Sequence, residues 1–190
     1  LNSQKSNTEL DFGAMFSNYI GDHFGELIFA EYALGAMPRD RFYENQGEKI
    51  EGNVYAKINH QINNRFSGYL DLQYRSIRYT ADGNLKGPTL ISVNEDYGFF
   101  NPKAGIVFRL NPKNKFYISY ARANREPTRA DFEEGNPKPE ELNDFELGWR
   151  FSGIRSSLLA NIYLMDYKNQ LVLTGALNDV GTPIRENVGK

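Results

Sequence analysis

Few residues of this chain stand in a pattern that could bind a metal ion. His23 and His60 lie far apart, and neither has a second histidine four residues later, so the HExxH zinc motif is missing. The 190 residues contain no cysteine, which excludes a disulfide framework and any cysteine-ligated zinc or iron–sulfur site. The sequence therefore predicts no metal ion and no other cofactor.

Two acidic pairs, Glu133-Glu134 and Glu140-Glu141, are the best candidates for acid–base catalysis. They lie in the polar segment "EEGNPKPEEL". A glycosidase needs two carboxylates about 5–10 Å apart across a cleft, and a solvated loop explains this segment better. There is no G-x-S-x-G motif, no P-loop and no dinucleotide-binding glycine pattern. We therefore predict that the chain is not an enzyme.

The segment "ANREPTRADF" concentrates charges that could touch a ligand. Arg125, Glu126 and Arg129 are the candidates for such contacts. A solvated loop with internal ion pairs is the favoured interpretation of this segment, and exposed pairs of that kind contribute about 0–1 kcal/mol each.

Polar and apolar residues alternate along the expected strands with a period of two. From Phe66 to Arg75, one face carries Phe66, Leu70, Leu72 and Tyr74, and the other carries polar residues. In a soluble sandwich the apolar face would point inward, whereas in a membrane barrel it would face lipid. Past Ser76 the pattern fails, because Arg78 falls on the apolar face and Ile77 and Tyr79 fall on the other, as expected of a strand that leaves the bilayer toward an extracellular loop.

Loop lengths favour the membrane barrel. Short turns are expected near residues 64, 112 and 153, and long polar connections from Thr80 to about Pro102 and from Ala123 to about Leu142. Outer-membrane barrels have short periplasmic turns and longer extracellular loops. Weaker strands are expected around Phe24–Tyr32 and from Gln170, and helical signals are poor. The predicted fold is an all-β antiparallel up-and-down meander of about 8–10 strands.

In such a barrel, polar residues on the second face would line a wet lumen. The candidates for lumen-facing residues are Lys57, Asn59, Asp71, Gln73, Arg75, Arg109, Arg150 and Asn161.

Composition excludes other classes. The net charge of −2 gives no electrostatic footprint for nucleic acid, and no run of about 18 apolar residues predicts a transmembrane helix. Aromatic residues make up 14% of the chain, as in β proteins with aromatic girdles.

Three segments together resemble the barrel of TonB-dependent outer-membrane receptors, nearest to the Bacteroidetes-type branch: "FFNPKAGIVFRLNPKNKFYISYARANREPTRADF", "PEELNDFELGWR" and "NIYLMDYKNQLVLTGALNDVGTPIRENV". The resemblance implies a 22-stranded transmembrane β-barrel with an N-terminal plug, in the outer membrane of a Gram-negative bacterium. It also implies active uptake of a scarce ligand of the ferric siderophore, haem or cobalamin class, driven by a TonB complex. It transfers no binding residue to this chain.

On this basis we expect residues 1–190 to be a fragment of the barrel domain, with the plug, the TonB box and the C-terminal strands outside it. The expected partners are outer-membrane lipid, the TonB complex through the missing plug, and a small-molecule or metal-chelate ligand, with possible edge-to-edge self-association. Two alternatives stay open. One is a complete small outer-membrane barrel with a structural or adhesive role, and the other is a soluble β-sandwich that binds carbohydrate.

Overall fold

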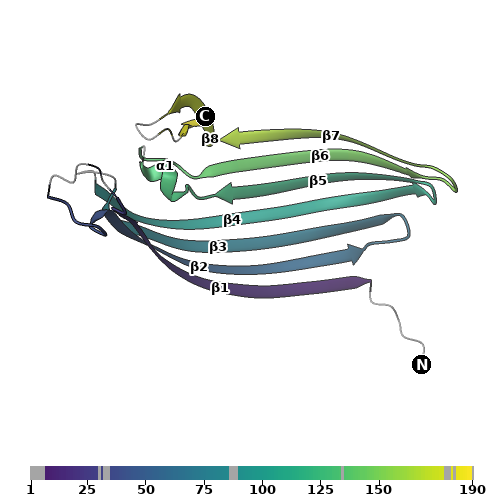
Figure 1. Ribbon diagram of the computed structural model, residues 1–190. Coiled ribbons are helices and arrows are strands. Elements are labelled where there is room, and N and C mark those ends of the chain that lie inside the picture. The colour runs from purple at the N-terminus through teal and green to yellow at the C-terminus, as the bar shows by residue number, and fades with distance from the viewer. Residues whose placement is uncertain are drawn as a thin grey trace.

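The computed structural model describes residues 7–29, 31, 35–85, 90–133, 135–177, 181 and 183–189. Seven strands form one antiparallel sheet in which each strand pairs with the next along the chain (Figure 1). A separate two-stranded hairpin and one short helix lie near the left-hand end of the sheet in Figure 1. The elements are β1 (Thr8–Glu26), β2 (Arg41–Gln61), β3 (Phe66–Asn84), β4 (Leu90–Asn111), β5 (Asn114–Arg125), α1 (Arg129–Glu133), β6 (Glu140–Ser152), β7 (Ser157–Lys168), β8 (Gln170–Leu177) and β9 (Pro183–Val188).

The predicted all-β meander is confirmed, with nine strands among the described residues. The strand expected around Phe24–Tyr32 is wrong in position, because β1 occupies Thr8–Glu26, and Tyr32 lies outside the described residues. None of the described helices is long and apolar enough to cross a membrane.

The three short turns form where the sequence places them, and asparagine side chains close two of them. The Asn63 carboxamide oxygen accepts the N–H groups of Arg65 and Phe66 at 2.8 and 3.0 Å. The Asn111 oxygen accepts those of Lys113 and Asn114 at 3.0 and 2.9 Å. Such bonds mimic a backbone turn and reverse the chain within a few residues. All three short turns lie at one end of the sheet (Figure 1).

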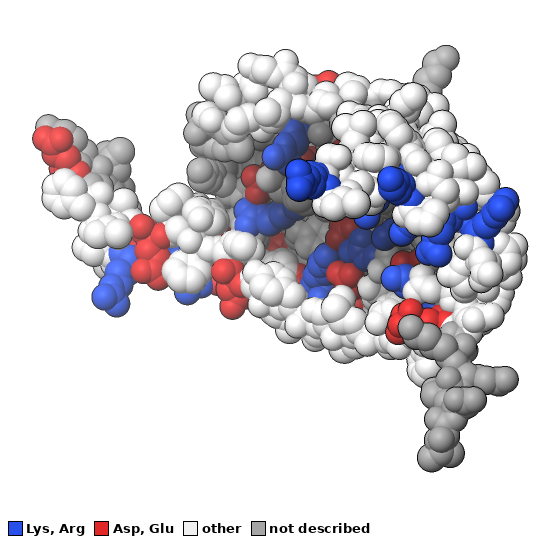
Figure 2. Space-filling model, turned by 90° about the vertical axis from the view of Figure 1, so that its right-hand side faces the viewer, with Lys and Arg blue, Asp and Glu red and all other residues white. Residues whose placement is uncertain are grey.

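The sheet is curled, and its two faces differ in chemistry. Viewed from the short-turn end, Lys, Arg, Asp and Glu side chains gather inside a hollow, whereas the outer surface is mostly uncharged (Figure 2). The outward face near this end carries exposed apolar side chains on every strand from β3 to β6. We call this set the apolar band: Leu70, Leu72, Tyr74, Phe100, Ile106, Phe116, Ile118, Phe145 and Leu147. Exposed apolar surface outside and charge inside is the arrangement of a membrane barrel.

At one level of β3 and β4 the two faces exchange character. Tyr74 pairs with Phe100 at the top of the apolar band, and the next outward pair is Ser76 with Gly98. Beyond it the outward residues as far as Asp82 and Ser92 are polar, and most of the inward ones are apolar, such as Ile77 at 1% exposure. The expected connection from Thr80 to Pro102 is therefore wrong. Its polar residues are the outward half of an alternation that continues to Asn84 and resumes at Leu90.

The connection between β5 and β6 folds back over the concave face. It contains α1, whose five residues are too few to show helical periodicity in the sequence. Phe132 of α1 packs against a small core formed by Ala81, Ile91 and Val93. At the start of the helix, the Asp131 carboxylate accepts hydrogen bonds from the N–H and the hydroxyl of Thr128 at 2.8 and 2.7 Å.

Candidate functional site

The predicted lumen residues share the concave face of the sheet. The register places Lys57 opposite Asp71, Gln73 opposite Asn101, and Asn161 opposite Gly148. Arg109 and Arg150 face the same side near the short turns, where both line one cavity. The structure thus brings the eight predicted residues onto a single polar wall, divided into an upper part near α1 and a lower part near the turns.

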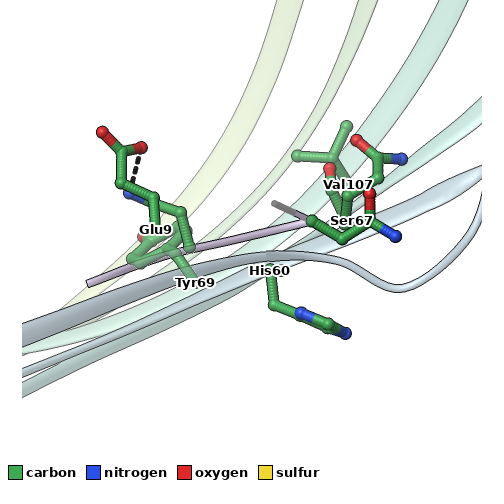
Figure 3. Close-up of a pocket in the computed structure, with 9 residues that line it drawn as sticks. Glu9, His60, Ser67, Tyr69 and Val107 are labelled. Carbon is green, nitrogen blue, oxygen red and sulfur yellow. Dashed lines mark hydrogen bonds between the residues drawn. The ribbon is translucent and has the colours of Figure 1, made fainter. Parts of the chain in front are cut away.

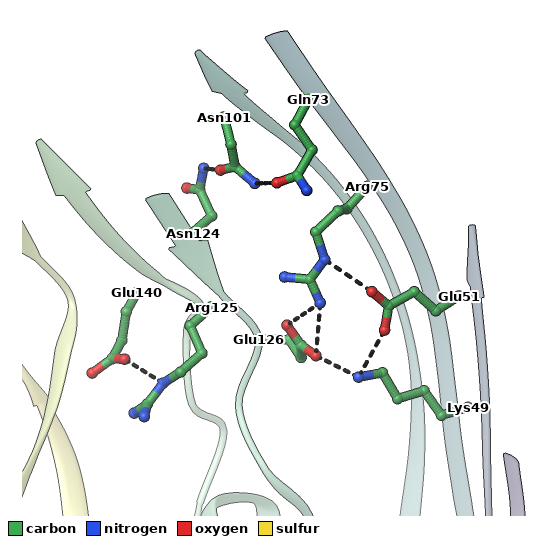
Figure 4. Close-up of polar contacts among 9 residues, drawn as sticks. All are labelled: Lys49, Glu51, Gln73, Arg75, Asn101, Asn124, Arg125, Glu126 and Glu140. Carbon is green, nitrogen blue, oxygen red and sulfur yellow. Dashed lines mark hydrogen bonds and ion pairs between the residues drawn. The ribbon is translucent and has the colours of Figure 1, made fainter. Parts of the chain in front are cut away.

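An ion cluster of Lys49, Glu51, Arg75 and Glu126 occupies the upper part (Figure 4). The Lys49 ammonium donates to Glu126 at 2.6 Å and lies 3.2 Å from Glu51. The Arg75 guanidinium donates to Glu51 at 2.9 Å and to Glu126 at 3.4 Å. The four charges cancel, so the ion cluster is a closed network rather than a free charge.

Burial and ion pairing have opposite effects on the pKa values of Glu126 and Lys49. Burial by itself would raise the pKa of Glu126, but the Lys49 hydrogen bond and the nearby cations outweigh it and lower the pKa below the ordinary 4.5. For Lys49, burial would lower the pKa, but Glu126 and Glu51 raise it above the ordinary 10.5. Both groups are therefore charged at neutral pH, and their bond ties the β5–β6 connection to β2.

A chain of three carboxamides continues the network beside the ion cluster. The Asn124 side chain donates to Asn101 at 2.8 Å, and Asn101 donates to Gln73 at 3.2 Å (Figure 4). Asn101 is only 5% exposed, and this chain of hydrogen bonds satisfies its buried polar atoms. The carboxamides connect the end of β5 to the centre of β3 and β4.

The three loop candidates for ligand contact are all in ion pairs. Arg125 bonds to Glu140 at 2.5 Å, Arg129 bonds to Glu133 at 2.7 Å, and Glu126 belongs to the ion cluster. This matches the interpretation of a loop with internal ion pairs, although Glu134 of one acidic pair lies outside the described residues. The three side chains hold the connection in place, and their charges are already compensated.

The lower part of the wall holds two adjacent cavities that share Gln61, Ser67 and Val107. The first, of about 330 Å³, is lined by Glu9 and Tyr69, and His60 lies on the other side of its strand (Figure 3). His60 shares a hydrogen bond with the Thr8 hydroxyl at 2.8 Å. Across the described residues, no group of three or more His, Cys, Asp or Glu side chains could hold a metal ion.

The second cavity, of about 430 Å³, is lined by four cations that we call the cation row: Arg65, Arg109, Lys115 and Arg150. Arg109 pairs with Lys115, and Lys115 pairs with Arg150, on three neighbouring strands. The Arg109 N–H donates to the carbonyl of Arg65 at 2.7 Å, which extends the row into the turn before β3. Like charges therefore stand side by side across the sheet.

Two residues of the ion cluster and two of the cation row were not predicted from the sequence. Lys49 and Glu51 lie beyond the strand segment whose alternation was analysed, and Arg65 and Lys115 lie in or next to turns. Alternation identified Arg75, Arg109 and Arg150, because each lies inside a regular strand. The four residues that were not predicted can be assigned to the ion cluster and the cation row only when the strand register shows which residues lie opposite one another.

Comparisons with known proteins agree with this geometry. The family model described as "TonB dependent receptor-like, beta-barrel" matches residues 2–190. Among solved structures, the ferric-catecholate import receptor Fiu of E. coli in its closed form matches 94% of the chain, with a TM-score of 0.69 and 18% identity. The FrpB iron transporter of Neisseria meningitidis matches 97%, with a TM-score of 0.61 and 15% identity. The ferric yersiniabactin uptake receptor FyuA of Yersinia pestis matches 90%, with a TM-score of 0.59 and 16% identity.

At these identities the structural matches establish the fold. The chain spans 30%, 29% and 27% of the lengths of those three proteins. A comparison with curated proteins found no match.

Proposed function

Because the chain belongs to the TonB-dependent receptor β-barrel family, whose barrels lie in the outer membrane of Gram-negative bacteria, we propose that it forms part of the wall of a receptor for active ligand uptake. The observation that carries the proposal is the pairing of an outward apolar band with an inward charged wall on the same strands. A wall of that kind separates lipid from a polar passage.

The structure favours this proposal over a soluble sandwich. A sandwich buries its apolar face against a second sheet. Here the described residues form one seven-stranded layer, and Phe145 and Leu147 of its outward face are 50% and 54% exposed. The members of this family are transport receptors, and we extend that to this chain in proposing that it has no enzymatic activity.

We propose that the eight polar residues of the concave wall face the lumen of the complete barrel. Within the described sheet, β1 pairs only with β2, and β7 only with β6, so both outer edges carry unpaired backbone groups. Such edges invite further strands. Further strands of the same barrel fit there, since the chain spans under a third of the solved receptors named above; in isolation the same edges would drive self-association.

For the ligand, we propose a ferric siderophore ahead of haem or cobalamin. The support is that the similar solved structures bear the names of a ferric-catecholate receptor, an iron transporter and a ferric yersiniabactin receptor. We also propose that energy comes from a TonB complex, as the family name indicates. Assignment to the Bacteroidetes-type branch stays a prediction from the sequence segments.

Uptake in the parent bacterium tests this function. Cells with and without the gene are supplied with radiolabelled ferric siderophores, haem or cobalamin under iron or cobalamin limitation. We expect deletion to abolish uptake of one ligand class, and a protonophore to abolish the same uptake in wild-type cells. Uptake that is unchanged by deletion for every ligand, or that persists with the protonophore, would overturn the proposal.

A further inference from the structure

The cation row differs from the cations in the upper part of the concave wall. In the upper part, Lys49, Arg75, Arg125 and Arg129 each have a carboxylate partner within 3.4 Å. In the cation row, none of the four residues forms an ion pair with a described carboxylate. Glu9, which lines the neighbouring cavity, bonds instead to the Asn59 carboxamide at 3.4 Å.

The arrangement of the cation row is unfavourable unless something compensates it. Side chains directly opposite each other on neighbouring strands lie about 5 Å apart, and like charges in such pairs destabilise a sheet. The register creates two such pairs in succession, Arg109 with Lys115 and Lys115 with Arg150. Arg65, Arg109 and Arg150 are exposed and Lys115 is half-buried, so the register sets their charges beside one another along the wall of an open cavity.

The cavity suits a ligand with several negative charges. Its volume of about 430 Å³ falls within the roughly 300–1,000 Å³ of small-molecule sites. Strand spacing of about 4.8 Å sets the cations at regular intervals along roughly 15 Å, so two or more anionic groups can be bound at once. Arginine binds carboxylate and phosphate oxygens with two parallel hydrogen bonds, and three of the four residues are arginine.

We propose that the cation row is a binding site for a ligand that carries two or more carboxylate or phosphate groups. The site lies at the short-turn end, away from α1 and the ion cluster, so it goes beyond the proposed uptake function. The same oxyanion chemistry has two possible sources: acidic side chains of another segment of the receptor, or a free small oxyanion.

The test uses the full-length receptor in detergent and the double variant Lys115→Gln/Arg150→Gln. A matched control, Lys113→Gln/Arg155→Gln, removes two positive charges from turns at the same end but outside the cavity. A third variant, Lys115→Arg/Arg150→Lys, keeps both charges. Binding of pyrophosphate, with two phosphate groups, and of tricarballylate, with three carboxylates, is measured by calorimetry at low salt, and thermal midpoints are measured over a salt series.

For a free oxyanion, we expect saturable binding that weakens at least tenfold in the Gln double variant and stays within twofold in the other two. For a source within the receptor, we expect no titration, but a lower thermal midpoint in the Gln double variant alone, with a difference that shrinks as salt rises. A thermal midpoint that is unchanged or higher in the Gln double variant, with no binding of either probe, would overturn the proposal, because it means that uncompensated repulsion was removed. Neither readout requires transport, so the result is independent of the uptake test.

Discussion

Replacing Glu126 with glutamine tests whether the ion cluster holds the β5–β6 connection against the wall. The substitution keeps the shape of the side chain and one acceptor, but removes the charge that Lys49 and Arg75 share. Among the hydrogen bonds that Glu126 accepts from these two cations, only the 2.6 Å bond from Lys49 has the geometry of a strong one, since those from Arg75 are 3.4 Å long. A charge-assisted hydrogen bond contributes about 1.5–3 kcal/mol. Because the Glu126 side chain is 16% exposed and glutamine still accepts a bond, we expect a loss of about 1.5–2 kcal/mol.

Amide hydrogen exchange in the full-length receptor measures this loss locally. A loss of that size raises the population of the opened connection roughly 10–30-fold, so exchange in residues 126–133 should accelerate by that factor while β6 and β7 stay unchanged. Asp96→Asn is the matched control. It removes a carboxylate that bonds to Arg78 at 2.8 Å, but both side chains are more than 60% exposed, and we expect no measurable change. Acceleration below twofold in Glu126→Gln, or an equal effect of the control, would refute the structural role of the ion cluster.

Further predictions concern pH, α1, the apolar band and one close contact. Because the pKa of Glu126 is lowered in the folded state, the wild-type connection should keep its protection at neutral pH and lose it as pH falls below about 4.5, whereas Glu126→Gln should show no such loss after correction for intrinsic exchange. Phe132→Ala should cost about 2 kcal/mol, less than the ~3–5 of a fully buried phenylalanine, and should expose residues 126–133 to thermolysin without changing the β6–β7 pairing. Leu147→Lys should destabilise the receptor by about 2–4 kcal/mol in urea unfolding from phospholipid vesicles, whereas Thr80→Lys, on the same outward face above the apolar band, should be nearly neutral. Gly148→Ala should cost about 1–3 kcal/mol in the same assay, because its Cβ would overlap the Tyr117 ring.

The period-two alternation was sufficient to predict the strands and to sort their faces. It failed where the faces exchange character beyond Ser76, because a polar residue at an apolar position looks the same whether a strand ends or inverts. Only pairing decides between the two, and the partner of Ser76 is Gly98 on the next strand. The same limit explains the long connection wrongly expected from Thr80 to Pro102.

The ion cluster and the cation row show a second limit of prediction from sequence. Lys49 and Glu126 are 77 residues apart, and nothing in their local sequence connects them. The cation row depends on the register of β4, β5 and β6, which is set by the tight turn between β4 and β5 and by which face of each strand is apolar. Arg109 and Arg150 could be assigned to the correct face from sequence, but their adjacency to Lys115 could not.

The level at which the sheet inverts its faces also fixes how deep the protein sits in the bilayer. Moving the sheet deeper into the membrane by two residues along each strand, about 5 Å along the membrane normal for strands tilted as in other barrels, would bring Ser76 and Gly98 into hydrocarbon. A second such step would bring Arg78 and its partner Asp96 into hydrocarbon. Moving it outward would lift the Tyr74 and Phe100 rings into water. Both displacements raise the free energy, so the boundary between the Tyr74–Phe100 pair and the Ser76–Gly98 pair fixes the depth of the protein in the bilayer. It holds the upper halves of β3 and β4, with α1 and the ion cluster, at a set height above the lipid surface whatever the lateral packing of the membrane around them.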